Sequence, residues 1–143
     1  MKKIFSLALG LVVLLILIWL FFIKGGETTL QEEFGKEIDS LKVNEIEVVR
    51  GSDEKTVEFK DGQTEKILDM LLNAELKEAK TSDGEATESY WISIRENDER
   101  TLGIRIDNSL VLTPHSYKGS KKKSGDYLLK DDSVLNFIES LFE

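Results

Sequence analysis

Lysines dominate the segment SYKGSKKKSGDY at residues 116–127, although the chain as a whole has a net charge of −8. The segment contains two glycines and four lysines: Lys118, Lys121, Lys122 and Lys123. Clustered lysines attract phosphate groups, and a phosphate-binding P-loop has the spacing G-x-x-x-x-G-K-[ST]. Here five residues separate Gly119 from Gly125, and Asp126 follows. The segment is therefore not a P-loop.

Three interpretations of these lysines stay open: a solvated loop tip, a contact with anionic lipid or an anionic envelope polymer, and a contact with an acidic patch on a partner protein. Each lysine close to an anionic membrane contributes about 1 kcal/mol to the free energy of membrane binding. Nucleic acid is not an expected partner, because 27 acidic residues against 19 basic ones give a surface of the wrong sign. We expect the solvated tip, with the lipid or polymer contact as the alternative.

A second group of candidate residues follows from the alternation in ESYWISIRENDERTLGIRID. Apolar residues face each other across this hairpin only if facing residue numbers sum to 196. That register places Trp91 opposite Arg105, and Ser93 opposite Gly103, on the other face. Trp91 then stacks on Arg105, is covered by a helix, or is an exposed anchor of a binding surface. Trp91, Ser93 and Arg105 are the candidate contact residues.

Catalytic and metal-binding residues are scarce. The chain has no cysteine and a single histidine, His115, which excludes thiol catalysis and sites built from several histidines. No serine lies in a G-x-S-x-G turn. The sequence therefore predicts a protein that is not an enzyme and has no catalytic residues, metal ligands or cofactor, and no small-molecule substrate is indicated.

An uncharged apolar run, IFSLALGLVVLLILIWLFFI, occupies residues 4–23. As a helix it is about 30 Å long, which matches the hydrocarbon thickness of a bilayer. A cleaved signal peptide has a shorter core and a small-x-small site, so we favour a retained anchor. Lys2 and Lys3 precede the run, which predicts a single-pass protein of the cell membrane with a cytoplasmic N-terminus and an extracytoplasmic domain.

This reading divides the chain into a cytoplasmic stub (1–3), a transmembrane anchor (4–23), a linker (24–28) and one domain (29–143). Two of the 19 basic residues precede the anchor, so the exported part has a net charge of −10. Without cysteine the domain has no disulfide, and a packed core must stabilise it.

Hydrophobic periodicity predicts the elements that position the candidate residues. Apolar residues at helical spacing predict helices over residues 29–41 (with a capping box at Thr29), over DGQTEKILDMLLNAE and over the C-terminal DDSVLNFIESLFE, capped by Asp132 or Ser133. Strand alternation predicts a hairpin from NEIEVVRGSDEKTVEFKDG, in which facing residue numbers sum to 105. Shorter strands are expected near residues 75–80, at LVLTP, ended by Pro114, and at DYLLK.

A weak internal repeat relates Lys60–Leu72 to Lys130–Phe142 at an offset of 70 residues. The expected fold class is therefore α+β: an N-terminal transmembrane helix, then one small domain with an antiparallel sheet and two or three helices on one face. The domain is expected to contain a pseudo-repeat of strand-strand-helix units.

The order of the segments IEVV, VEFKDGQTEKILDML, YWISI, GIRI and YLLKDDSVLNFIESL resembles the small envelope domains of Gram-positive bacteria called YhfM-like. The resemblance covers residues 43–142. Members of that group are commonly lipoproteins, whereas this chain lacks the cysteine that would carry the lipid. The resemblance implies an envelope location and this fold, and it implies no reaction.

The sequence thus leads to two hypotheses. The first is a membrane-anchored extracytoplasmic module that binds an envelope protein or peptide through Trp91, Ser93 and Arg105 on a sheet face or edge. The second is a membrane-proximal tether or sensor whose lysine segment contacts anionic lipid or cell-wall polymer.

Overall fold

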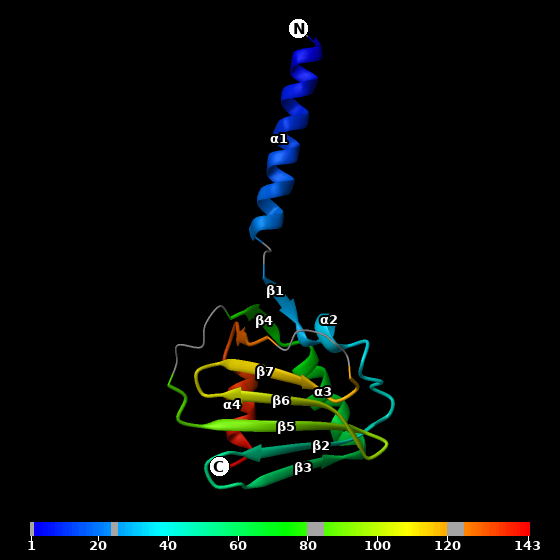
Figure 1. Cartoon of the computed structure of the whole chain (residues 1–143), viewed down its shortest axis with the longest axis vertical. Coiled ribbons are helices and arrows are strands. Elements are labelled where there is room, and N and C mark those ends of the chain that lie inside the picture. The colour runs from blue at the N-terminus through cyan, green and yellow to red at the C-terminus, as the bar shows by residue number, and fades with distance from the viewer. Residues whose placement is uncertain (1, 24–25, 80–84, 120–124) are drawn as a thin grey trace.

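The structure is a computed structural model that describes residues 2–23, 26–79, 85–119 and 125–143. Helix α1 (Lys2–Ile23) has 22 residues and leads to the sheet domain (Figure 1). Its side chains are described for residues 10–20, where every one is exposed. Among the described residues, no helix meets the combined length and hydropathy of a membrane span.

The domain is built on one eight-stranded sheet in which all neighbouring strands are antiparallel. The strand order is β1-β4-β8-β7-β6-β5-β2-β3, so β1 and β3 form its two edges. The strands are β1 (Glu27–Thr29), β2 (Val43–Arg50), β3 (Thr56–Lys60), β4 (Glu75–Glu78), β5 (Ser89–Glu96), β6 (Glu99–Asp107), β7 (Val111–Ser116) and β8 (Tyr127–Leu129).

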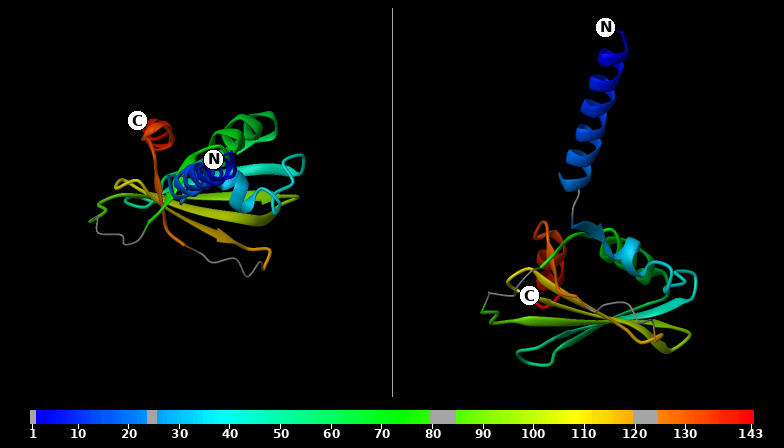
Figure 2. Two further views of the ribbon diagram at one scale, coloured as in Figure 1. Left: turned by 90° about the horizontal axis from the view of Figure 1, so that it is seen from above. Right: turned by 45° about the horizontal axis from the view of Figure 1, so that its top comes forward.

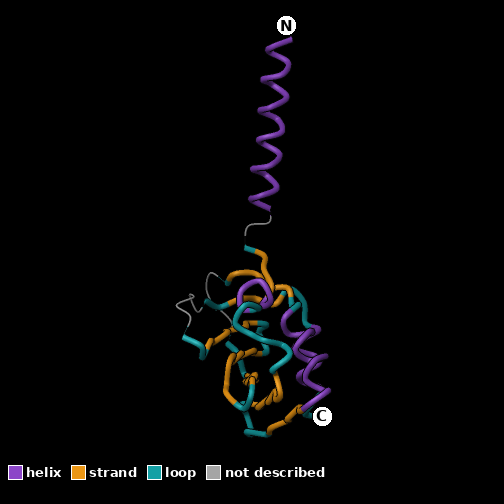
Figure 3. The backbone as a smooth tube through the Cα atoms, turned by 90° about the vertical axis from the view of Figure 1, so that its right-hand side faces the viewer, coloured by secondary structure: helices purple, strands orange, loops and turns teal. Residues whose placement is uncertain are grey.

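Helices α2 (Leu30–Phe34), α3 (Thr64–Leu72) and α4 (Ser133–Ser140) lie on one side of this sheet (Figure 2), and a short 3-10 helix, η1 (Asp61–Gln63), precedes α3. Seen from the side, helices and strands form two layers (Figure 3). Between them lie the apolar side chains of the inner sheet face, including Ile46, Ile92, Ile104 and Leu112, all at most 1% exposed. The α+β fold class is thus confirmed.

Both predicted hairpin registers are confirmed. Ile46 faces Phe59 and Val48 faces Val57 between β2 and β3. Between β5 and β6, Ile92 faces Ile104 and Trp91 faces Arg105. Burial of alternate residues fixes these registers, because a slip of one residue would move the apolar side chains to the solvent face.

A two-residue turn joins β5 to β6. Asn97 (φ 49°) and Asp98 (φ 68°) both adopt the left-handed conformation, as a type I′ turn requires. The Asn44 side chain donates a hydrogen bond to Asp98 Oδ1 (2.7 Å) and accepts one from the Asp98 amide (3.2 Å). The turn that connects β5 and β6 is therefore fastened to β2.

The predicted helix over residues 29–41 is wrong in its extent, because α2 ends at Phe34. Its start is confirmed: the Thr29 hydroxyl accepts a hydrogen bond from the Glu32 amide (3.2 Å). Leu30, Phe34 and Ile38 are buried as predicted, whereas Leu41 is 95% exposed. Gly35 caps α2 at its C-terminus, and its low helix propensity favours the early end.

Pro114 lies inside β7 and does not end it, contrary to the prediction. The Tyr117 amide donates to the Thr101 carbonyl. Backbone groups of an antiparallel strand point alternately to its two neighbours, so His115 and Thr113 also form hydrogen bonds with β6. Pro114 falls between them, and its ring nitrogen points away from β6. On that side, β8 pairs only with Val111 and Leu112. No hydrogen bond is lost there, and the proline is tolerated.

Strand β1 was not predicted from the sequence. It pairs with β4, so residues 27 and 28, assigned to the linker by sequence, belong to the sheet. The predicted strands near residues 75–80 and at DYLLK are confirmed as β4 and β8, which pair with each other. Both α3 and α4 closely follow a strand, and the pseudo-repeat of strand-strand-helix units stays a prediction.

The start of α4 differs in detail from the prediction. Asp132 is the N-cap residue, but its side chain makes no capping hydrogen bond. Asp131 accepts hydrogen bonds from the amide (2.9 Å) and the hydroxyl of Ser133 instead. These hydrogen bonds, with that of the Ser133 side chain the largest, lower the pKa of the Asp131 carboxyl.

Candidate functional site

Trp91 and Arg105 meet on the outer face of the sheet, opposite the side that carries the helices. The Arg105 guanidinium lies 5.6 Å from the centre of the Trp91 ring, a cation–π arrangement. The indole is nonetheless 53% exposed. Of the three alternatives that the sequence leaves open, stacking on Arg105 and exposure thus occur together, and α2, α3 and α4 lie on the other side.

These two side chains line a surface pocket of about 330 Å³. Its other walls come from the β2–β3 turn at Gly51 and Ser52, and from the segment that precedes and begins β5 at residues 86–89. The pocket therefore joins three parts of the chain that are distant in sequence.

Hydrogen bonds hold these walls together. The Gly51 amide donates to the Ser89 carbonyl (2.7 Å), which ties the turn to β5. Glu88 Oε1 accepts from the amides of Ser52 (3.1 Å) and Ser89 (2.9 Å). Hydrogen bonding to the Ser52 side chain is the main cause of the lowered pKa of Glu88. An ionised carboxylate thus lines the same pocket as Arg105.

Ser93 and Gly103 face each other two positions further along the strands, as predicted. Ser93 is half-buried and does not line the pocket. Gly103 leaves space for the Tyr117 ring, because a Cβ at position 103 would lie only 3.1 Å from Tyr117 Cε2. The Tyr117 ring therefore rests on the outer face of β6.

Tyr117 takes part in a second stack of the same kind. The Arg100 guanidinium lies 5.5 Å from the centre of its ring. His115 packs edge-on against the same ring with 4.8 Å between ring centroids. The outer face of β5, β6 and β7 thus carries two arginine-on-aromatic stacks.

Lys118 has a specific partner in the domain. Its ammonium group lies 2.7 Å from Glu96 Oε2 and 2.7 Å from the Glu37 carbonyl oxygen. Glu96 is only 7% exposed, and its other oxygen accepts from the Asp39 amide (2.8 Å). This ion pair joins the end of β5, the segment after α2 and the residues after β7. Lys121, Lys122 and Lys123 lie outside the described residues.

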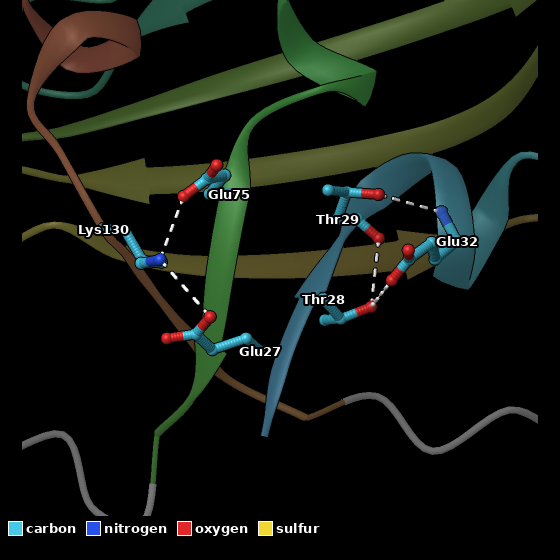
Figure 4. A pocket seen from close by; sticks show the side chains of 6 residues that line it. All are labelled: Glu27, Thr28, Thr29, Glu32, Glu75 and Lys130. Carbon is cyan, nitrogen blue, oxygen red and sulfur yellow. Dashed lines mark hydrogen bonds and ion pairs between the residues drawn. The ribbon is translucent and has the colours of Figure 1, made fainter. Parts of the chain in front are cut away.

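A pocket of about 260 Å³ lies at the β1 edge of the sheet (Figure 4). Lys130 bridges two carboxylates there, at 3.4 Å from Glu27 and 3.0 Å from Glu75. Hydrogen bonding, first to Glu75, raises the pKa of Lys130. The Thr28 hydroxyl lies 3.1 Å from a Glu32 carboxylate oxygen. The polar groups drawn in Figure 4 pair with one another, so they fasten β1 to β4 and to the end of β8.

Across the described ranges, no three acidic or histidine side chains are grouped so that they could hold a metal ion. Comparisons with protein-family models, with curated proteins and with solved structures find no match to this chain. The resemblance to YhfM-like envelope domains is therefore an untested prediction, and the site rests on geometry alone.

Sequence reasoning found Trp91 and Arg105 but missed Arg100 and Tyr117. A signal for them was present, because a glycine within a strand often marks the close approach of another group. Gly103 was placed in the correct register, yet nothing in its immediate sequence identifies Tyr117 as the ring above it. That contact depends on the pairing of β6 with β7.

Proposed function

We propose that the chain is a membrane-anchored extracytoplasmic module that binds an envelope protein or peptide through the outer sheet face at Trp91, Ser93 and Arg105. The observation that carries this proposal is the half-exposed Trp91 ring. It is supported from one side by Arg105 and stands on a sheet face away from the helices. Exposed aromatic rings with an arginine beside them are typical anchors of protein interfaces.

The rigid surroundings of Trp91 favour recognition over a purely structural role. The β2–β3 turn and residues 86–89 are joined by hydrogen bonds, so the pocket beside the ring is formed before any partner arrives. A preformed pocket lowers the entropic cost of binding. The shallow polar walls suit a segment of another protein.

The proposed anchor is α1, which begins with Lys2 and Lys3 and so fits the positive-inside orientation. Its described side chains, residues 10–20, are all exposed, and they are apolar except for Gly10. Such a surface needs an apolar surrounding, which a bilayer supplies. Only residues 24–26 separate α1 from β1, so the domain would stay close to the membrane.

The test places a photo-crosslinking residue at position 91 of the full chain in intact cells. Position 66, exposed on α3, is the matched control, and position 122 tests the lysine segment. Capture of one discrete protein from position 91, absent from position 66, is the expected result. Capture of lipid or polymer from position 122 alone would replace this proposal by the tether hypothesis.

A further inference from the structure

Two of the four arginines of this acidic chain are left without a carboxylate partner among the described residues. Arg50 pairs with Asp53 (2.5 Å) and Arg95 with Glu45 (3.3 Å). The side chains of Arg100 and Arg105 take part in no ion pair or hydrogen bond within the described ranges, and each lies over an aromatic ring. With 27 acidic residues in the chain, this leaves two oriented guanidinium groups free for a ligand.

Both groups belong to the same face of the same strand. Arg105 and Gly103 are two positions apart in β6, so they point to the same side. Tyr117 lies against Gly103 on that side, and Arg100 lies over Tyr117. A register shift in the β5–β6 pairing places Arg100 opposite Arg95 and Arg105 opposite Trp91, which are four residues apart in β5. At about 3.3 Å per residue, the two arginines therefore stand roughly 13 Å apart on the same face.

Both arginines are exposed, so their N–H groups are accessible to a ligand. A guanidinium with accessible N–H groups can bind a carboxylate with two parallel hydrogen bonds. The ring also limits the conformations of the arginine, so less entropy is lost when a carboxylate binds.

The charges around the stacks favour a polypeptide over a uniform polyanion. On the same face, Glu47 stands opposite Glu58 between β2 and β3, and Glu88 lines the pocket beside Arg105. A polymer with a negative charge on every unit would meet these carboxylates with repulsion. A peptide can place acidic residues over the arginines and neutral or basic residues over the glutamates.

From these observations we infer that the outer face of β5, β6 and β7 binds an extended acidic peptide segment, with one carboxylate on Arg105 beside Trp91 and another on Arg100 beside Tyr117. The inference rests on the proposed binding function and adds the chemistry of the partner. In an extended segment, residues four apart lie on the same side and about 13 Å from each other. This spacing matches that of Arg100 and Arg105, so the segment carries acidic residues at positions i and i+4.

The test uses the full chain in detergent with Trp19 replaced by Phe, which leaves Trp91 as the reporting tryptophan. The probe is a short synthetic peptide of threonine and serine with two glutamates four positions apart. Its controls are the same peptide with two glutamines and the same peptide with two adjacent glutamates. Binding is followed by Trp91 fluorescence, and polyglycerol phosphate serves as the uniform polyanion.

The spaced diglutamate peptide is expected to bind most tightly. Arg100→Gln and Arg105→Gln should each weaken its binding about tenfold, since each removes a charge-assisted contact. Lys66→Gln, which also removes one exposed positive charge but lies on α3 on the other side of the sheet, should leave binding unchanged. Equal binding of the glutamine peptide, or tighter binding of the polyanion, would overturn the inference. If one of these results is found and position 91 nevertheless captures a protein in cells, the proposed binding function stands and only the inferred acidic partner is wrong. If position 91 captures nothing, both fail.

Discussion

Trp91 and Ile92 are neighbours in β5 that point to opposite faces of the sheet, one 53% exposed and the other 1% exposed. The two faces of β5 therefore have different roles, one in the core and one at the surface. Ile92 belongs to the core beneath the helices, and Trp91 belongs to the proposed binding surface.

This separation predicts different effects of two truncations. Ile92→Ala removes buried methyl groups and should lower the free energy of unfolding by about 2–5 kcal/mol. Trp91→Ala removes an exposed cation–π contact and should cost about 1 kcal/mol or less. Urea unfolding of the full chain in detergent measures both. An equally large loss from Trp91→Ala would assign the ring to stability and remove the basis of the binding proposal.

The buried carboxylate of Glu96 should be a stability determinant. Glu96→Ala leaves the Asp39 amide without its acceptor and removes one of the two acceptors of the Lys118 ammonium, which should cost about 2–3 kcal/mol. A double-mutant cycle with Lys118→Ala should give a coupling energy of about 1 kcal/mol or more. The exposed Lys42–Asp39 pair is the control, with an expected coupling below about 0.5 kcal/mol. Additive effects of Glu96→Ala and Lys118→Ala would contradict the prediction.

Acid should destabilise the domain through carboxyl groups that are held ionised by hydrogen bonds. The hydrogen bond from Arg50 is the main cause that lowers the pKa of Asp53 far below its ordinary value of 3.8, and the hydrogen bond from Lys42 lowers that of Asp39. Because both pKa values fall on folding, the stabilisation is fully present above 3.8 and is lost as the pH falls toward the folded-state values.

Chemical denaturation between pH 7 and pH 2 measures this effect. The free energy of unfolding should decline below about pH 4, and Asp53→Asn should make that decline shallower. A decline of unchanged steepness in Asp53→Asn would show that other carboxyl groups cause it.

Gly103 should control the position of the Tyr117 ring. In Gly103→Ala the new Cβ would lie 3.1 Å from Tyr117 Cε2, closer than most such contacts, so the ring must move. We expect changed proton chemical shifts of Tyr117 and His115 and weaker binding of the diglutamate peptide. Gly62→Ala is the matched control, because its Cβ would have no heavy atom within 4 Å. Unchanged shifts in Gly103→Ala would show that the ring does not rest on Gly103.

The strand registers and helical faces could be predicted because they depend on local alternation. Ile46 and Phe59, or Ile92 and Ile104, pair correctly once apolar residues are required to share a face. The same reasoning placed Trp91 on Arg105. It also located α3, whose apolar residues are buried as expected.

Features that depend on distant segments could not be predicted in this way. Strand β1 has only three residues, Glu27–Thr29, and no apolar pattern of its own. The tolerance of Pro114 depends on where β8 stops pairing with β7. The stack of Arg100 on Tyr117 and the contact of Lys118 with Glu96 require β6 and β7 to be side by side. The helical spacing of apolar residues also predicted a helix that continues beyond Phe34. The chain leaves the helix there and still buries Ile38 from a loop.

The pairing of β4 has a consequence for the order in which the domain assembles during synthesis. The hairpins β2–β3 and β5–β6 connect neighbouring segments and can form as soon as they emerge. Strand β1 pairs only with β4, and β4 reaches the rest of the sheet through β8, with Leu76 facing Leu129. Strands β1 and β4 therefore join the sheet only after residue 129 has been synthesised. Until then, the central strands can fold without them, and a nascent chain halted before β8 should leave β1 and β4 open to proteases.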